Sequence, residues 1–371
     1  MTTLNAVTRR LFERLRDEVA NVDAEFAVAP SSIEEAAAVI AAAADAGIPT
    51  AFLGGGTHGG YGSRTDVDLV ITTSRLNRIV DWQPDDLTVL VEAGVPVDTL
   101  EDEIADRSQT AVFPETAPGA TVGGVVAAGL SGYRRLRYGP TRDRVLQVQI
   151  ATGYGKAITG GSPVVKSSTG YGVPRLATGS LGSLGLIGTV MLKLWSHPHT
   201  TATVEITDAA AVLAETYRPL AVLETSEGSY LYLGGAPEQV AAQARHIGGE
   251  PVPGLAWPGQ IDAAIRIEFR VPARFVRPAI DRAQRLGTSR WIAEHGVGRV
   301  EADVATIDAA SFGNARAWAE SVGGALVVVA DDDLGVDPWG TPPASVEIQR
   351  RIKASFDPSG ICNSGILPGG L

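Results

Sequence analysis

Cysteine is almost absent from this sequence: Cys362 is the only one among 371 residues. One cysteine cannot form a disulfide within the chain, and it excludes a cysteine-rich metal or iron–sulfur site. A reducing compartment such as the cytoplasm is therefore the location that we expect. We expect Cys362 itself to be a small buried residue rather than a redox-active thiol.

Long apolar segments and an excess of positive charge are missing as well. No apolar run reaches the ~20 residues that a membrane-spanning helix needs, and the first 23 residues lack the apolar block of a signal peptide. The 31 lysines and arginines are outnumbered by 42 acidic residues, which leaves a net charge of −11. This acidic balance argues against nucleic acid or an anionic membrane as the main partner.

The common phosphate-binding motifs are also missing, although glycine is abundant. No Gly-Lys-Ser/Thr triplet occurs, which excludes a P-loop. Residues 54–62 nevertheless contain six glycines in nine positions. Glycine leaves backbone N–H groups uncovered, and successive N–H groups in a turn form a concavity that binds anions. The stretch predicts a site for phosphate or pyrophosphate, with a flexible surface loop as the plain alternative.

The surroundings of this glycine-rich stretch exclude a Rossmann fold. Gly54, Gly56 and Gly59 match G-x-G-x-x-G, but apolar residues 48–53 precede the loop and residues 69–72 follow it. A strand–loop–strand segment opens no helix, so the match to the dinucleotide fingerprint is accidental.

The rest of the chain predicts an α+β protein. Expected helices, several with an N-cap or a terminal glycine, are 36–46, 97–105, 125–128, 237–247, 273–284 and 345–356. Expected strands are 48–53, 69–72, 78–80, 87–93, 145–152, 189–194, 203–206, 221–224, 230–233, 265–271, 291–294 and 325–329. From about residue 200 strands and helices alternate, which favours a small α/β sheet that caps the first part of the chain.

Four sequence blocks together carry a resemblance. They are GGGTHGGYG at 54–62, PGATVGGVVAAGLSGYRRLRYGPTRD at 118–143, GGSPVVKSSTGYGVPRLATGSLGSLGLIGTVMLKL at 160–194 and IKASFDPSGICNSGIL at 352–367. In this order the chain resembles FAD-binding oxidoreductases of the vanillyl-alcohol oxidase/p-cresol methylhydroxylase (PCMH) type. The strings L-S-G-x-R-R and V-K-x-x-x-G-Y resemble the branch that contains the E subunit of bacterial glycolate oxidase.

The resemblance implies a domain plan and an activity. Residues 1–199 would form a PCMH-type FAD-binding domain of two subdomains that divide near 85–95, residues 200–340 a ferredoxin-like α/β cap, and residues 341–371 a segment returning to the FAD domain. The expected function is oxidation of a small 2-hydroxyacid such as glycolate or D-lactate, or of a related alcohol, by hydride transfer to flavin N5. An oxidase of natural-product biosynthesis that uses dioxygen and a flavin-holding subunit of a multi-subunit dehydrogenase remain open. The electron acceptor would be a partner subunit, a quinone or dioxygen.

The resemblance also implies which residues hold FAD. Thr57 and the glycines around it would bind the pyrophosphate, the second block would line the cofactor, and Ile187 would contact the adenine end through its backbone. The expected cofactor residues are Gly54, Gly55, Gly56, Thr57, His58, Gly59, Gly60, Pro118, Gly119, Thr121, Gly123, Gly124, Ser131, Gly132 and Ile187. Tight packing turns are the alternative for any single one of these glycines.

His58 has two possible roles. In covalent members of the family a histidine of this loop is bonded to the flavin 8α-methyl group, whereas the glycolate-oxidase branch has another residue there and binds FAD noncovalently. Thr57 departs from the usual covalent G-G-H string. The second covalent anchor of the family, a cysteine in the second block, is missing here. His58 is thus either the covalent anchor or a polar residue of the loop.

Three residues are candidates for catalysis. His295 lies in an E-H-G-x-G string that resembles one in D-2-hydroxyacid dehydrogenases, and a histidine suits removal of the hydroxyl proton. Arg266 and Arg270 share one face of a predicted strand and could bind a substrate carboxylate. A structural histidine and ordinary salt bridges near Glu268 are the alternatives. No metal is expected, because the H-x-G-D-G-N-x-H string of metal-binding relatives is absent.

Further basic residues have open roles. Arg134, Arg135 and Arg137 cluster in the second block and would meet the FAD phosphates, an anionic substrate or a partner subunit. Lys166 matches a family lysine, for which we expect a structural role. Gly172 stands where the family usually has aspartate.

Overall fold

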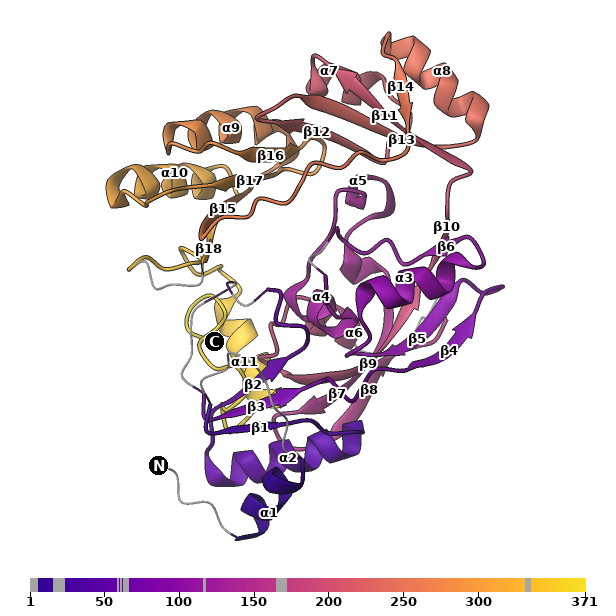
Figure 1. The fold of residues 1–371 in the computed structure, drawn as a ribbon. Helices are drawn as coiled ribbons and strands as arrows, with labels where there is room; N and C mark the ends of the chain where they lie inside the picture. Colours follow the sequence, from indigo (N-terminus) through magenta and orange to yellow (C-terminus); the bar gives the residue numbers. More distant parts are fainter. Residues whose placement is uncertain are drawn as a thin grey trace.

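The computed structural model describes residues 6–15, 24–58, 60, 62, 67–115, 118–164, 172–330 and 335–371. The described residues form a lower lobe with two main sheets and a two-stranded pair, and an upper lobe with one large sheet (Figure 1). Among the described residues, none of the helices is both long and apolar enough to cross a bilayer.

The first sheet of the lower lobe is small and parallel. Its strands β1 (Phe26–Val28), β2 (Thr50–Leu53) and β3 (Leu69–Thr72) lie in the order β1-β3-β2. Helices α1 (Ala6–Arg14) and α2 (Ile33–Ala46) belong to this part. Ser32 caps α2 by accepting a hydrogen bond from the Glu35 N–H, and Gly47 ends it in the left-handed conformation with φ of 64°.

The second sheet of the lower lobe is antiparallel, with strand order β4-β5-β9-β7-β8. Its strands are β4 (Ile79–Gln83), β5 (Thr88–Glu92), β7 (Val145–Thr152), β8 (Ala157–Gly161) and β9 (Gly185–Lys193). The accompanying helices are α3 (Val97–Ala105), α4 (Val122–Ala128), α5 (Arg135–Tyr138), η1 (Thr141–Asp143) and α6 (Val173–Ala177). The short strands β6 (Gln109–Thr110) and β10 (Trp195–Ser196) pair separately.

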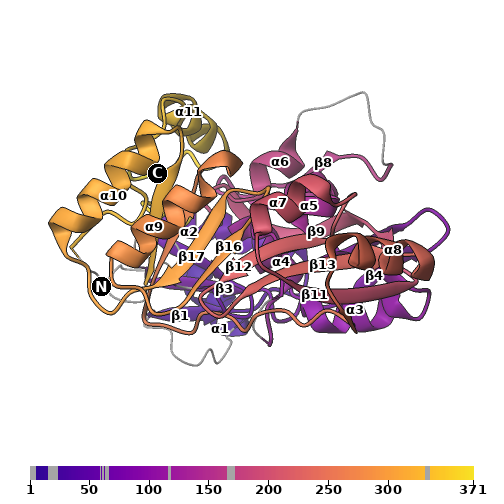
Figure 2. The same cartoon turned by 90° about the horizontal axis from the view of Figure 1, so that it is seen from above.

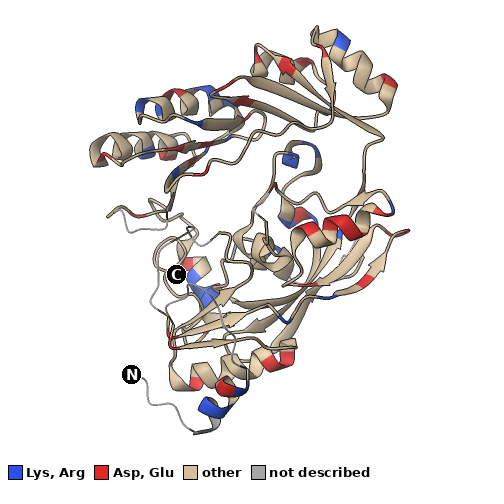
Figure 3. Ribbon diagram, in the orientation of Figure 1, with Lys and Arg blue, Asp and Glu red and all other residues tan. Residues whose placement is uncertain are grey.

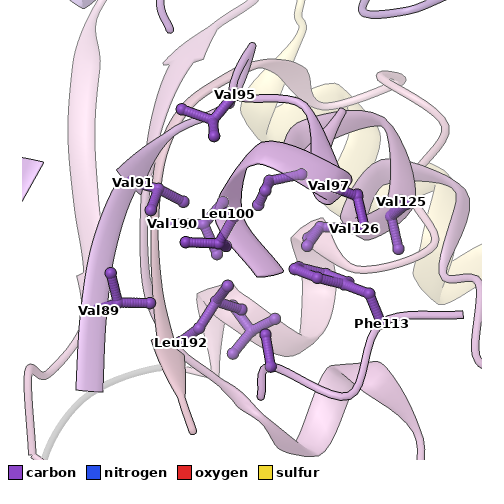
Figure 4. Packing of buried hydrophobic residues seen from close by; sticks show 14 of the residues in the cluster. Val89, Val91, Val95, Val97, Leu100, Phe113, Val125, Val126, Val190 and Leu192 are labelled. Carbon is purple, nitrogen blue, oxygen red and sulfur yellow. The ribbon is translucent and has the colours of Figure 1, made fainter. Parts of the chain in front are cut away.

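A continuous apolar core joins this second sheet to α3 and α4 (Figure 4). Leu100 and Val97 of α3 pack beside Val89 of β5, Val190 of β9 and Val126 of α4. The core fixes where α4 begins. It therefore positions the glycine-rich loop just before α4.

The upper lobe is one antiparallel sheet made of two similar halves. The first half is β11 (Thr200–Ile206), α7 (Ala209–Glu215), β12 (Ala221–Thr225), β13 (Ser229–Gly235), α8 (Pro237–Ile247) and β14 (Pro251–Pro253). The second half is β15 (Ile265–Arg270), η2 (Ala273–Phe275), α9 (Val276–Arg285), β16 (Trp291–Glu294), β17 (Arg299–Asp303), α10 (Ala309–Ser321) and β18 (Ala325–Ala330).

Each half has the β-α-β-β-α-β order of a ferredoxin-like unit. The sheet order β14-β11-β13-β12-β16-β17-β15-β18 shows that the halves meet through their second strands, β12 and β16. The expected ferredoxin-like cap is thus present twice. The helices of both halves lie over the same side of the sheet when it is seen from above (Figure 2).

The chain returns to the lower lobe after the cap. Helix α11 (Val346–Phe356) lies beside the lower lobe (Figure 1). The segment after it runs along β2: Thr50 and Cys362 form a parallel bridge, and the Thr50 N–H donates to the Ile361 carbonyl over 2.8 Å.

Candidate cofactor and substrate site

The first and second glycine-rich blocks are in direct contact. A Cβ on Gly54 would collide with the Thr121 hydroxyl, and a Cβ on Gly55 would collide with the Gly119 carbonyl. Residues far apart in sequence are thus packed backbone against backbone. Gly119 itself has φ of 81°, and no atom of the described residues lies within 4 Å of its Cβ position, so this contact leaves one face of Gly119 uncovered by them.

The third and fourth blocks join the same region through Asn363. Its amide nitrogen donates to the Leu181 carbonyl over 2.6 Å, and its amide oxygen accepts from the Phe52 N–H over 3.2 Å. Gly129 of the second block packs against Gly179 of the third, where a Cβ would come within 3.0 Å of backbone. All four blocks that were identified in the sequence therefore meet in space.

A buried lysine ties the third and fourth blocks together. The Lys353 ammonium donates to the Ser183 carbonyl at 2.9 Å, to the Cys362 carbonyl at 2.9 Å and to the Asp357 carboxylate at 2.8 Å. The Asp357 carboxylate also accepts from the Cys362 N–H at 2.9 Å. Each polar group of this buried cluster has a partner, as buried charges require.

A cavity of about 960 Å³ opens between the two lobes. Volumes of ~300–1,000 Å³ are typical of ligand sites. Its walls come from the second block, the third block, the C-terminal segment and strands β15 and β17 of the cap. Charged or polar residues on these walls include Ser131, Arg135, Arg142, Arg175, Ser180, Ser183, Glu268, Arg270, Arg299 and Lys353.

The predicted cofactor residues occupy two neighbouring places rather than one. Ser131 lines the cavity. The loop residues Gly54, Gly55, Gly56, Thr57, Gly60, Pro118, Gly119, Thr121 and Gly124 lie where the first two blocks meet or beside that contact. Gly59 lies outside the described residues. The roles of these residues toward FAD stay predictions.

Four of the predicted cofactor residues have an additional structural role. Thr121 caps α4 by accepting from the Gly124 N–H over 3.2 Å. Gly123 abuts Ala93, and Gly132 abuts Pro114 and Glu115, so that neither has room for a side chain. Ile187 belongs to β9, which lies between β5 and β7 in the sheet. Its side chain is buried in the apolar core, which leaves only its backbone for contact with a cofactor.

His58 lies at the boundary between the first block and the cap. Its Nδ1 is 2.7 Å from the Thr57 hydroxyl. Burial lowers the pKa of the imidazole, the nearby Arg266 guanidinium lowers it further, and Glu301 opposes them. His58 does not line the cavity.

His295 lies on the side of the cap sheet that the helices cover. Its Nε2 is 2.9 Å from the Glu224 carboxylate, and that carboxylate also accepts from Arg277 of α9 over 2.7 Å. The His295 side chain is buried and is not part of the cavity wall. This contact with Glu224 supports the alternative interpretation of His295, in which the histidine has a structural role.

Arg266 and Arg270 lie on the opposite, cavity-facing side of β15. Arg266 donates to Glu301 over 3.0 Å, and Arg270 donates to Glu268 over 2.5 Å. Ion pairs within the cap, which were the alternative for both arginines, are thus present. Arg270 lines the cavity, whereas Arg266 does not.

The cavity-facing side of β15, β16 and β17 carries a charge network that the sequence did not reveal. Arg299 is its centre, with Glu268 at 3.1 Å, Glu294 at 3.0 Å and Glu301 at 2.7 Å. Strand periodicity places Glu268 and Arg270 on one face, but only the pairing of β15 with β17 shows which residues lie opposite them.

Two buried carboxylates of this network have pKa values that are shifted in opposite directions. Burial raises the pKa of Glu294 to about 7, although Arg299 opposes the shift. Burial also acts to raise the pKa of Glu268, but Arg299 and Arg270 together hold it well below the ordinary value. The Glu294 Oε2 has no hydrogen-bond partner among the described residues.

The remaining candidates have clear places. Arg134 contacts Glu115 at 3.3 Å, and Arg137 donates to the Arg218 carbonyl at 2.9 Å. Cys362 is fully buried, and burial raises the pKa of its thiol far above the ordinary range. Lys166 lies outside the described residues.

Comparison with known proteins adds the family of the lower lobe. The profile of a family described as FAD binding domain matches residues 24–161. Residues 24–161 are an FAD-binding domain. The match confirms the cofactor that the glycine-rich blocks predicted, and it spans the first block and the whole second block.

The relatives of this FAD-binding domain are oxidoreductases by name. The glycolate oxidase subunit GlcE of Escherichia coli K12 is 27% identical over 309 residues, which are 77% of this chain and 83% of that subunit. The D-2-hydroxyglutarate dehydrogenase of Xanthomonas citri pv. viticola is 34% identical over 173 residues, 46% of this chain. This second alignment spans only 36% of the dehydrogenase's length.

A solved structure confirms the fold around the FAD-binding domain. An alkyldihydroxyacetonephosphate synthase matches with a TM-score of 0.65 and 15% identity, covering 92% of this chain and 76% of the synthase chain. At this identity the likeness shows the fold alone. The expected α+β class with a PCMH-type FAD-binding domain and a cap is confirmed.

The geometry fits FAD. Bare backbone at Gly56 and Gly119, both with positive φ, offers N–H groups to a pyrophosphate without steric obstruction. Ser183 lines the cavity, and its buried hydroxyl has no partner among the described residues. A buried hydroxyl of this kind requires a ligand or water.

Proposed function

We propose that the protein is an FAD-dependent oxidoreductase that oxidises the CH–OH group of a small 2-hydroxyacid such as glycolate or D-lactate. The cavity supports this proposal most directly, because six basic side chains line it in a chain whose net charge is −11. A locally positive pocket attracts a carboxylate. The names of the relatives point to the same substrate class.

The residues that would hold FAD are those of the four blocks. The backbone around Gly56 and Gly119 would bind the pyrophosphate, and Ser131 and Ser183 would contact the part of the cofactor that enters the cavity. When bound, FAD supplies the acceptor for the hydride that leaves the substrate carbon. The domain plan of the sequence stays part of this proposal: 1–199 for FAD, 200–340 for the substrate and 341–371 returning to the FAD domain.

FAD is proposed to bind noncovalently. The His58 Nδ1 faces the Thr57 hydroxyl, and the ring lies near Arg266 and Glu301 of the cap rather than on the cavity wall. This arrangement supports the role of a polar loop residue at the lobe boundary.

The hydroxyl proton needs an acceptor, and two adjacent residues are candidates. His295 lies on the helix-covered side of the sheet with Glu224. Glu294 lies on the other side, directly behind Arg299 of the cavity wall, with a pKa of about 7. We favour Glu294, because it lies on the cavity-facing side of the sheet in contact with Arg299 of the cavity wall, and its Oε2 has no partner among the described residues.

A partner subunit is a second part of the proposal. The alignment with GlcE covers 83% of a protein that is named as a subunit, whereas the longer relatives are matched over less than half of their length. We infer that the chain passes electrons to a partner subunit, with a quinone or dioxygen as the other acceptors. One cysteine, which is buried, is consistent with a cytoplasmic location.

Anaerobic mixing of the purified yellow protein with glycolate, D-lactate, L-lactate and D-2-hydroxyglutarate tests the function. We expect at least one acid to bleach the flavin absorbance, and a neutral alcohol of the same size to leave it unchanged. A flavin that dithionite reduces but that none of the acids reduces, with or without the partner subunit, would contradict the proposal. Reduction only after the partner is added would identify a flavin-holding subunit.

The proton acceptor is tested by comparing Glu294→Gln with His295→Gln, which change neighbouring residues on opposite faces of the sheet. If Glu294 holds the proton, the Glu294→Gln variant loses the ionisation near pH 7 from its pH profile of flavin reduction. Under the same assumption the His295→Gln variant keeps the profile of the unmodified protein. The reverse result would assign the role to His295.

A further inference from the structure

Arg135 stands out among the basic residues of the cavity. It lies in the short helix α5, between the lower lobe and the cap (Figures 1 and 3), and it lines the cavity. Among the described residues, no carboxylate or carbonyl is hydrogen-bonded to this guanidinium. Five N–H donors are thus presented to the cavity without an acceptor from the described protein.

The neighbouring arginines are all engaged in other contacts. Arg134 donates to the Phe113 carbonyl at 2.9 Å, and Arg137 donates to the Arg218 carbonyl. Arg270 and Arg299 are paired with carboxylates of the cap sheet. Arg142 and Arg175, which also line the cavity, lie 3.8 Å and 3.9 Å from Asp143 and are mostly exposed, so water satisfies much of both.

Burial makes the position of Arg135 costly without a ligand. Burial lowers the pKa of its guanidinium, Glu294 and Glu268 act to raise it, and Arg299 and Arg270 act to lower it. Arginine remains charged in proteins under such conditions. A half-buried charge that faces both signs of charge across a cavity needs a compensating anion at close range.

The chemistry of the guanidinium indicates which anion fits. Its planar, forked donors match the two oxygens of a carboxylate, and such bidentate pairs are directional as well as strong. Across the same cavity, Arg270 already holds Glu268, which leaves Arg135 as the cation available for a ligand. A phosphate of FAD is the other oxyanion that this position could meet.

We propose that Arg135 binds the carboxylate of the 2-hydroxyacid and thereby fixes the orientation of the substrate. This inference rests on the proposed function and deepens it. With the carboxylate at Arg135, the α-carbon and its hydroxyl are held at a set distance from the lower lobe, beside the Arg299 network of the cap. Arg135 is therefore the residue that selects acids over neutral alcohols.

The test compares Arg135→Met and Arg135→Lys with Arg175→Met as a matched control at the rim of the same cavity. Oxalate, a carboxylate that the enzyme cannot oxidise by this reaction, is titrated by calorimetry and by its effect on the flavin spectrum. We expect the dissociation constant of oxalate to be about 10- to 100-fold higher for Arg135→Met, because hydrogen bonds to a charged group are lost. We expect an intermediate loss for Arg135→Lys, and no more than about twofold for Arg175→Met, whose side chain is already mostly hydrated.

FAD content is measured for every variant. The proposal requires Arg135→Met to retain FAD as fully as the control. A variant that loses FAD would assign Arg135 to the cofactor phosphates and overturn the proposal, as would unchanged oxalate binding. In both cases the 2-hydroxyacid activity of the unmodified protein still stands. If the unmodified protein neither binds oxalate nor is reduced by any 2-hydroxyacid, the proposed function fails with it.

Discussion

At the residue scale, single glycines allow the two loops that are proposed to bind the FAD pyrophosphate to pack against each other. The chain has no room for a Cβ at Gly55, because that atom would meet the Gly119 carbonyl. Even an alanine at position 55 would weaken phosphate binding, because its methyl group would push the two loops away from each other. The two loops would move apart, and the N–H groups of both would no longer face one ligand.

We therefore predict that Gly55→Ala weakens FAD binding by about 10- to 100-fold, since overpacking costs ~1–3 kcal/mol. Quenching of FAD fluorescence during titration of the apoprotein measures the change. Gly172→Ala is the control, because Gly172 has φ of −71° and no atom of the described residues lies within 4 Å of its Cβ position. Equal affinities of the two variants would show that the contact between Gly55 and Gly119 is unimportant.

The pKa of Glu294 predicts a pH dependence of stability. The folded-state pKa of about 7 exceeds the ordinary 4.5, so the folded state binds the proton more tightly than the unfolded state. The contribution of the protonated Glu294 carboxyl to the free energy of unfolding is complete below pH 4.5 and is lost as the pH rises through 7. Because glutamine stays neutral, the free energy of unfolding of Glu294→Gln should rise by about 3 kcal/mol relative to that of the unmodified protein as the pH increases across this range.

Urea unfolding between about pH 4 and 8, the range that brackets both pKa values of this carboxyl, measures the effect. Glu347→Gln, at an exposed position, is the control and should show a constant difference from the unmodified protein. A constant difference for Glu294→Gln as well would show that Glu294 titrates normally. Glu268 should behave oppositely, because its pKa is lowered and its stabilisation is lost as the pH falls.

The sequence indicated the close contact between the glycine-rich blocks more clearly than the positions of the charged residues of the cap, for a physical reason. Gly54 to Gly56 are recognisable because a backbone that approaches a phosphate allows few other residues. The role of a charged residue depends on its neighbours in space. Glu294 and His295 are adjacent in sequence and therefore lie on opposite faces of the sheet, but only the register with Arg299 and Val222 shows which neighbours each of them meets.

Helices and strands with a clear local sequence pattern were also easier to predict than those without one. The structure agrees with the predicted bounds of α3 and α8, where apolar spacing or an N-terminal proline is clear. Helix α10 was missed, because Gly313 and scattered small residues give it a weak amphipathic pattern. Strand β17 was missed because its alternation places Arg299, Glu301 and Asp303 on one face and only two apolar residues on the other.

Helix α11 is attached to the lower lobe chiefly through Lys353, which makes it testable as an element. Lys353→Met would leave the fully buried Asp357 carboxylate without its cation and would release two backbone carbonyls. Breaking a buried pair typically costs ~3–5 kcal/mol. We expect a loss of that size in the free energy of unfolding, measured with urea.

Lys156→Met is the control for this prediction, because Lys156 is exposed. The control should unfold at nearly the same urea concentration as the unmodified protein. A Lys353→Met variant as stable as the control would mean that α11 is held by its apolar contacts alone. The buried lysine would then have no role in closing the fold.

On the scale of the whole molecule, the two halves of the cap have different roles. The lower face of the first half is apolar: Tyr232 stacks on Trp257 at 4.2 Å, and Tyr133 of the lower lobe lies 5.5 Å from Trp257. The lower face of the second half carries the Arg299 network and lines the cavity. One unit therefore attaches the cap, and its copy forms a wall of the site.

A cofactor that lies between lobes should stabilise both of them. We predict that FAD can be removed without breaking a covalent bond and that the apoprotein unfolds at a lower temperature. Returning FAD at about 100 times its dissociation constant should restore about 2.7 kcal/mol. Calorimetry at several FAD concentrations measures the shift, and acid precipitation shows whether the yellow colour stays in solution. Colour that remains with the precipitated chain, with no dependence of the melting temperature on added FAD, would instead establish a covalent bond, for which His58 is the residue to replace first.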